Sequence, residues 1–146
     1  MRIYLAHQIT GLSYDDVMAY YKKLEVALRA QGYEVLCPMV AKEYLRDQEH
    51  LASVGYRFPV STNHAIFERD RWMVERADIV LVVPVVQNRP AIVCLFELAW
   101  ASLLRKHTIV CMEPDSVCRH AFVLEAADIV FNTLQEVTDY LAKLNP

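Results

Sequence analysis

The spacing of apolar residues along the chain predicts short buried strands that alternate with helices. Five apolar runs have the length of strands, and they lie at residues 3–6, 33–37, 78–83, 108–112 and 128–131. Every residue from Ile79 to Val83 is apolar, which is typical of a parallel strand covered on both faces. This alternation predicts a doubly wound α/β fold, Rossmann-like or flavodoxin-like, with a five-stranded parallel sheet flanked by helices.

Apolar residues recur at helical spacing between these runs. Ser13 is placed to cap the first helix, and Gly32 is placed to end it. Four further helices are expected, at residues 63–76, 93–106, 121–126 and 134–144. Segment 41–51 is also interpreted as helical, whereas 53–61 and 87–91 are interpreted as loops.

The composition restricts the class of protein. The chain has 146 residues, of which 55% are hydrophobic and 23% are charged, so we expect one folded domain over residues 1–146. A formal net charge of −3 argues against a general nucleic-acid or anionic-membrane surface. The apolar run at the N-terminus is too short for a signal peptide, and no apolar stretch is long enough to span a membrane. We therefore expect a cytoplasmic protein without nucleic-acid or membrane partners.

Scarce glycine and scattered cysteine exclude two kinds of site. The chain has only 3 glycines and contains neither G-x-G-x-x-G nor G-x-x-x-x-G-K, which excludes a glycine-rich nucleotide loop. Its 4 cysteines lack the C-x-x-C spacing of zinc sites and lie mostly in apolar runs, so buried free thiols are expected. The sequence predicts neither a metal nor a cofactor.

A ligand site is expected where the strands end. Ligands of doubly wound folds sit outside the carboxyl ends of the strands. The loops concerned are 7–13, 37–40, 84–92 and 112–119. Glu97 is the first candidate for a residue of this site, because apolar residues surround it at the i±3 and i±4 positions of its predicted helix. It is interpreted either as a solvent-facing glutamate or as a partly desolvated nucleophile or base.

Two further residues join Glu97. Asp70 lies on the apolar stripe of its predicted helix, where a carboxylate is unexpected, although a solvated charge run is the alternative. Tyr4 lies in the first predicted strand. It is interpreted either as an ordinary core residue or as a tyrosine whose hydroxyl donates a hydrogen bond to a carboxylate. Two carboxylates and a tyrosine, without metal ligands or a glycine loop, suggest chemistry at an acetal-like carbon. Glycosyl transfer with retention is one such reaction, in which one carboxylate is the nucleophile and a second acid serves the leaving group about 5–5.5 Å away, a distance that sequence spacing does not establish.

Several segments of the chain, taken in order, resemble one known family. They are Ile3-Tyr4-Leu5-Ala6-His7-Gln8-Ile9-Thr10-Gly11, residues 61–70, Ala77-Asp78-Ile79-Val80, Glu97-Leu98-Ala99-Trp100-Ala101 and residues 119–128. Together they make the chain similar, over nearly its whole length, to the nucleoside 2-deoxyribosyltransferases of phage and bacterial type. The resemblance implies a nucleoside or nucleotide substrate together with a free nucleobase.

The resemblance also implies roles for individual residues. Glu97 matches the nucleophile that attacks C1′ and forms a covalent deoxyribosyl-enzyme, Asp70 matches the acid that protonates the leaving base, and Tyr4 matches the tyrosine that positions the nucleophile. Substrate-binding roles are implied for His7, Gln8, Ile9, Gly11, Arg89, Cys94, Arg119 and His120. Family members are homo-oligomers whose sites are completed by a neighbouring subunit, and the region of Arg119 and His120 would be that contribution.

Departures from the family pattern leave three functions open. Many members have Gly-Thr where this chain has Val93 and Cys94, and a glycine where it has His7. Exchange of nucleobases on 2′-deoxynucleosides is the leading hypothesis. Hydrolysis of nucleoside 5′-monophosphates by an N-glycosidase is the first alternative, with basic side chains for the phosphate. A non-catalytic nucleotide-binding module is the second, because the loop before the glutamate is altered.

Overall fold

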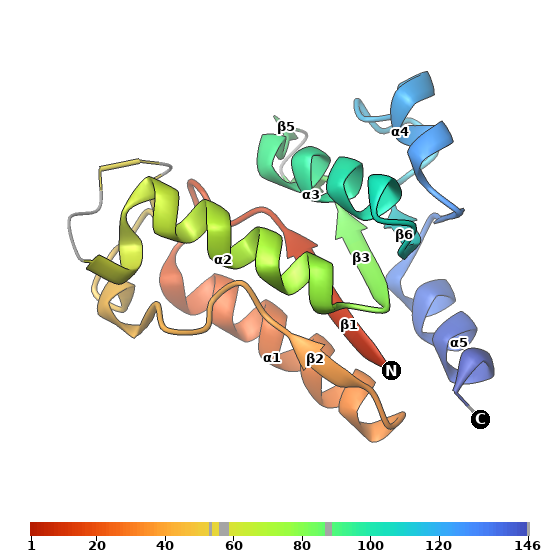
Figure 1. The fold of residues 1–146 in the computed structure, drawn as a ribbon, viewed down its shortest axis with the longest axis horizontal. Coiled ribbons are helices and arrows are strands. Elements are labelled where there is room, and N and C mark those ends of the chain that lie inside the picture. The colour runs from red at the N-terminus through yellow and green to blue at the C-terminus, as the bar shows by residue number, and fades with distance from the viewer. Residues whose placement is uncertain (53, 56–58, 87–88, 146) are drawn as a thin grey trace.

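The computed structural model describes residues 1–52, 54–55, 59–86 and 89–145, and its centre is a five-stranded parallel sheet (Figure 1). The strand order is β2-β1-β3-β6-β7. These strands are β1 Arg2–His7, β2 Glu34–Leu36, β3 Ile79–Val83, β6 His107–Cys111 and β7 Ile129–Phe131. Of the two orders predicted from the sequence, this is the flavodoxin-like one, and the predicted doubly wound α/β fold is confirmed.

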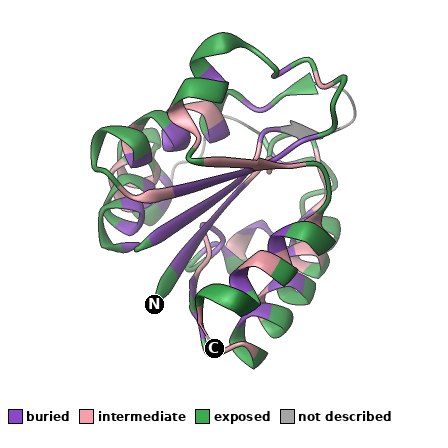
Figure 2. Ribbon diagram, turned by 90° about the vertical axis from the view of Figure 1, so that its right-hand side faces the viewer, coloured by how far each residue is buried: buried purple, intermediate pink, exposed green. Residues whose placement is uncertain are grey.

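The sheet separates two hydrophobic cores, because successive side chains of a strand point to opposite faces. In β1, Ile3 and Leu5 join one core, whereas Tyr4 and Ala6 join the other. Helices α1 (Tyr14–Ala30) and α5 (Leu134–Leu144) pack on the first face. The second face carries α2 (Asn63–Arg76), α3 (Ile92–Leu103) and α4 (Ala121–Ala126), and Figure 2 shows the buried strands between the two helical layers.

The local signals at the first helix act as predicted. The Ser13 hydroxyl accepts a hydrogen bond from the backbone N–H of Asp16 and so caps α1. Gly32 follows the helix with φ +83°, a conformation that is costly for residues with a side chain. Helix α2 also occupies the predicted range, and Thr62 caps it through a hydrogen bond from the N–H of Ala65.

Segment 41–51 corrects the sequence interpretation. Only a short 3-10 helix, Glu43–Leu45, forms there. The backbone of this segment bonds to the β1–α1 loop instead of to itself: Gly11 N–H donates to the Leu51 carbonyl, and Leu51 N–H donates to the Leu12 carbonyl. Leu51 is thereby held in the core, and these non-local bonds replace the ladder of a longer helix.

Three smaller differences concern loops and helix ends. In the predicted loop 87–91, β5 (Arg89–Pro90) pairs antiparallel with β4 (Val85–Val86), while 87–88 lie outside the described residues. The predicted loop 53–61 contains a 3-10 turn, Pro59–Ser61, and its residues 53 and 56–58 are likewise not described. Helix α3 ends at Leu103 because Arg105 adopts a left-handed φ of +55°.

None of the described helices combines the length and the apolar character needed to span a bilayer.

Candidate active site

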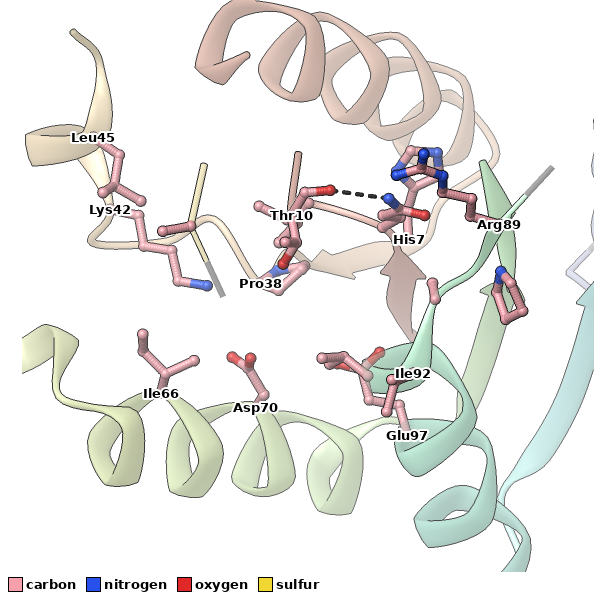
Figure 3. Close-up of a pocket in the computed structure, with 16 residues that line it drawn as sticks. His7, Thr10, Pro38, Lys42, Leu45, Ile66, Asp70, Arg89, Ile92 and Glu97 are labelled. Atoms are coloured by element: carbon pink, nitrogen blue, oxygen red, sulfur yellow. Dashed lines mark hydrogen bonds between the residues drawn. The ribbon is translucent and has the colours of Figure 1, made fainter. Parts of the chain in front are cut away.

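A cavity of about 380 Å³ lies beyond the carboxyl end of β1, which is a size typical of ligand sites (Figure 3). Its walls come from the β1–α1 loop, the segment after β2, one side of α2, β5 and the first turns of α3. Three of the four loop regions expected to bind ligands therefore line it. Loop 112–119 does not, although the Cys118 thiol lies 3.6 Å from the Pro84 carbonyl.

Glu97 is a buried carboxylate at this cavity. It lies in the second turn of α3, faces the sheet and is only 2% exposed. The hydroxyl of Tyr4, from the middle of β1, donates a hydrogen bond of 2.5 Å to its Oε1. Burial raises the pKa of Glu97 to about 8; the bond from Tyr4 opposes this change, and the nearby charge of Asp70 adds to it.

Asp70 reaches the same cavity from another helix. It lies in the middle of α2, on the side that faces the sheet, and is 5% exposed. Burial raises the pKa of its carboxyl group, while the positive charges of Lys42 and Arg69 lower it. Its Oδ1 has no hydrogen-bond partner among the described residues and lies 3.8 Å from Nε of Arg69. A buried acceptor without a partner is uncommon in folded proteins and is available to a ligand.

His7 forms the end of β1 and lines the cavity as a neutral group. Its ring stacks on Tyr20 with centroids 3.8 Å apart, and its carbonyl accepts a bond of 3.3 Å from the Tyr21 hydroxyl. Burial lowers the pKa of His7 to about 4, so the imidazole carries no charge near neutral pH. His7 therefore offers hydrogen bonding and ring surface to a ligand rather than positive charge.

Lys42 is a site residue that the sequence interpretation missed. It lines the cavity opposite α2 and is 5% exposed, which is rare for a lysine. Burial lowers its pKa, and the carboxylates of Asp70 and Glu97 oppose that change. No periodicity marks Lys42 as buried, because it lies in an irregular segment whose side-chain directions depend on tertiary contacts.

The structure brings together part of the predicted substrate-binding set. His7, Gln8, Ile9 and Arg89 line the cavity with the two carboxylates. The other predicted substrate-binding residues do not line the cavity; they are Gly11, Cys94, Arg119 and His120. Gly11 is held by its bond to Leu51, and Cys94 belongs to α3 and is wholly buried in the core. Arg119 and His120 are exposed just before α4.

The start of α3 lies at the cavity. Ala91 is the N-terminal cap residue and makes no capping bond through its side chain. Together with Ile92 and Val93 it lines the cavity, beside the side chain of Arg89. The first N–H groups of a helix have no partner within the helix, and they attract negative charge.

The described His, Cys, Asp and Glu residues do not form a metal centre. No group of three or more His, Cys, Asp or Glu residues in the described part of the chain is arranged to hold a metal ion. The four cysteines are free thiols, as expected, and three of them are buried.

The chain is similar to known proteins in its structure. No family model matches the sequence, and no curated protein matches it. Among solved structures, a CMP N-glycosidase from Clostridium botulinum superposes with a TM-score of 0.60 at 16% identity, covering 99% of each chain. The 2-deoxyribosyltransferase of Bacillus psychrosaccharolyticus has a TM-score of 0.63 at 17% identity, covering 96% of this chain and 92% of that chain. A 2-deoxyribosyltransferase from Leishmania mexicana has a TM-score of 0.63 at 18% identity, covering 97% of each.

These matches define a fold class. The chain has the fold of 2-deoxyribosyltransferases and of a CMP N-glycosidase. The resemblance seen in the sequence is confirmed at the level of the fold, over nearly the whole chain.

Proposed function

We propose that this protein exchanges nucleobases on 2′-deoxynucleosides through a covalent deoxyribosyl intermediate on Glu97. The observation that carries the proposal is the Glu97 carboxylate, which is buried, bonded by Tyr4 and placed at a cavity that also contains Asp70. A pair of carboxyl groups at one cavity is what enzymes that cleave glycosidic bonds use, one group acting on C1′ and the other on the leaving group. The fold shared with 2-deoxyribosyltransferases supports the same reaction.

The first half-reaction transfers the sugar to the enzyme. Tyr4 bonds Oε1 of Glu97, which leaves Oε2 to form a bond with C1′. The bond between C1′ and the base nitrogen breaks as the new bond forms, and its electron pair goes to the base. Asp70 gives its proton to the departing base, because a neutral base leaves more easily than an anion. A buried Asp70 with a raised pKa suits this proton donation.

The second half-reaction reverses these steps with another base. The incoming base attacks C1′ through a ring nitrogen, and the Asp70 carboxylate removes the proton from that base. The bond between C1′ and Oε2 of Glu97 breaks, its electron pair goes to Oε2, and the carboxylate that Tyr4 bonds is restored. Water in place of the second base gives hydrolysis, and Asp70 then removes a proton from that water.

We also propose that copies of this chain associate through the outer side of α2 and α3. Phe67 and Phe96 both meet the ring of Trp100 edge-on, with centroids 5.0 and 6.1 Å apart, and both phenylalanines are exposed. Phe122 is 82% exposed, and it follows Arg119 and His120 in the sequence. Apolar patches of this kind are typical of interfaces between proteins. In such an oligomer, Arg119 and His120 would reach the cavity of a neighbouring copy.

Hydrolysis of nucleoside 5′-monophosphates is the second candidate function. Arg89 and the uncapped start of α3 lie at the same cavity, and together they suit a phosphate group. The fold shared with a CMP N-glycosidase supports this candidate.

Base exchange and base release separate these functions. The protein is incubated with deoxynucleosides or their 5′-monophosphates, with and without an acceptor base, and the products are followed by chromatography. Exchange on nucleosides without a 5′-phosphate supports the transferase, whereas release from monophosphates alone supports the hydrolase. Absence of turnover with every substrate contradicts both and leaves a binding module. Mass spectrometry is expected to show a pentosyl adduct on the wild type and none on Glu97→Ala, and full activity of that variant would overturn the nucleophile.

A further inference from the structure

Lys42 provides a positive charge inside the cavity that the proposed reaction has not used. Its side chain lines the cavity, and it is 5% exposed. No side-chain hydrogen bond and no ion pair joins its ammonium group to another of the described residues. An ammonium group has three donors and no acceptor. The group is therefore available to an acceptor atom of a ligand.

The backbone around Lys42 holds it in this position. Ala41, the preceding residue, has φ +60°, a left-handed conformation that is unfavourable for alanine and needs support from its surroundings. Two turn bonds enclose Lys42: its own N–H donates to the Met39 carbonyl, and its carbonyl accepts from the N–H of Leu45. Leu45 is buried, so the turn is anchored to the core on one side of Lys42.

Lys42 lies on the side of the cavity where the base would be. In Figure 3 its ammonium group is near the Asp70 carboxylate, on the side away from Glu97. The sugar must meet Glu97 and the departing base must meet Asp70, so a group beyond Asp70 faces the base. Leu45 and Ile66 line the same end of the cavity and supply apolar surface for a planar ring.

We propose that Lys42 selects 6-oxopurine nucleosides over 6-aminopurine nucleosides by donating a hydrogen bond to O6, beside the N7 that Asp70 protonates. This inference rests on the proposed function and names its substrate class. Hypoxanthine and guanine present acceptors at both N7 and O6, whereas adenine presents an acceptor at N7 and a donor at N6. An ammonium group meets O6 with a charge-assisted bond, but it meets the adenine amino group with two donors face to face.

Binding of two nucleosides that differ at this one position tests the proposal. The Glu97→Gln variant is used as background so that bound nucleosides are not consumed, and calorimetry measures the Kd for deoxyinosine and deoxyadenosine. Lys42→Met is then added, because methionine keeps an unbranched apolar side chain without the ammonium group. Lys42→Arg keeps a donor, and Lys22→Met on the exposed surface of α1 serves as the matched control.

The expected result is a preference of about tenfold or more for deoxyinosine, the value of one charge-assisted hydrogen bond. Lys42→Met removes this preference, while Lys42→Arg and Lys22→Met keep it. Equal affinities with Lys42 present, no binding of deoxyinosine, or a preference that survives Lys42→Met overturns the proposal. Deoxyinosine 5′-monophosphate is titrated in the same way. If Lys42→Met weakens binding of this monophosphate but not of deoxyinosine, the proposal is overturned, because Lys42 then binds the phosphate.

Turnover separates the failure of this inference from the failure of the proposed function. Base release from deoxyinosine and deoxyadenosine is measured with Glu97 intact, with and without Lys42→Met. If Lys42→Met lowers turnover of both nucleosides by the same factor, Lys42 acts on Asp70 and not on the base, which overturns the selection of 6-oxopurines. Turnover without selectivity between the two nucleosides supports the proposed function and contradicts the Lys42 inference. Selective binding without turnover supports the Lys42 inference and contradicts the proposed function.

Discussion

The hydroxyl of Tyr4 lies 2.5 Å from Oε1 of Glu97, although 93 positions separate the two residues in the sequence. Both residues are almost completely buried, so the bond is made in a medium where a charged group depends strongly on its hydrogen-bond partners. The Tyr4 hydroxyl stabilises the ionised form of Glu97 and lowers its pKa against the effect of burial. A positioned and partly stabilised carboxylate is what a nucleophile needs.

Replacing Tyr4 with phenylalanine is expected to lower kcat/KM and to move its pH dependence. Loss of a hydrogen bond to a charged group costs about 1.5–3 kcal/mol, or roughly ten- to a hundredfold in rate. The bond lowers the pKa of Glu97, so its loss raises that pKa above about 8 and moves the rising limb of the profile to higher pH. The measurement is kcat/KM for a deoxynucleoside against pH.

Tyr33→Phe is the matched control for this prediction. The Tyr33 hydroxyl donates a bond of 2.7 Å to the Leu141 carbonyl, next to the other face of the sheet. Its loss is expected to reduce stability without moving the pH profile. Identical profiles for wild type and Tyr4→Phe would contradict a role of Tyr4 in stabilising the Glu97 carboxylate.

Replacing Glu97 with glutamine is expected to stabilise the protein at alkaline pH while abolishing turnover. The pKa of Glu97 is raised from 4.5 to about 8 in the folded state, so the folded protein holds this proton more tightly than the unfolded chain does. The resulting stability is fully present below pH 4.5 and is lost as the pH rises through 8. Between pH 5 and 8 the loss is about 3–4 kcal/mol.

Urea unfolding of both proteins at pH 5 and pH 8 measures this effect. The difference between the variant and the wild type isolates Glu97 from other groups, such as His7, whose lowered pKa acts in the opposite direction at acid pH. Glutamine keeps an oxygen that accepts the Tyr4 bond. A stability difference that does not change with pH would show that burial does not raise the pKa of Glu97.

Replacing Asp70 with asparagine is expected to slow turnover according to the leaving base. Deoxyguanosine needs a proton at its base, so its turnover is expected to fall by about a hundredfold or more. The base of 7-methyl-2′-deoxyguanosine already carries a positive charge and leaves without that proton, so the fall for this nucleoside is expected to be much smaller. Equal losses for the two nucleosides, measured as kcat, would contradict proton donation by Asp70.

Replacing Phe96 with glutamate is expected to separate the copies of the chain and to lower activity with it. Phe96 lies on the outer side of α3, where it is exposed and meets Trp100 edge-on. A charge there opposes burial of this face against a second copy. Sedimentation of the wild type and the variant measures the state of association. Val26→Glu, at an exposed position of α1 on the other side of the sheet, is the control and is expected to change neither property.

Local signals predicted most of the elements but not all of them. Ser13 and Gly32 act within a few residues of the helix that they bound, so they were recognisable without knowledge of the fold. Segment 41–51 was misinterpreted because the backbone partners of Leu51, Gly11 and Leu12, lie about forty positions away in the sequence. Lys42 was missed for the same reason, since nothing near it in the sequence shows that it faces a cavity.

The sequence by itself determined which residues are unusual. Glu97 and Asp70 are carboxylates on apolar helical stripes, and the hydroxyl of Tyr4 lies within a buried strand, so each departs from its local pattern. Only the tertiary structure decided that these residues meet. The strand order places β1 beside β3, and the alternation of side chains along β1 turns Tyr4 toward the face that carries α2 and α3. Convergence of residues so distant depends on the packing of the whole sheet, which no local pattern encodes.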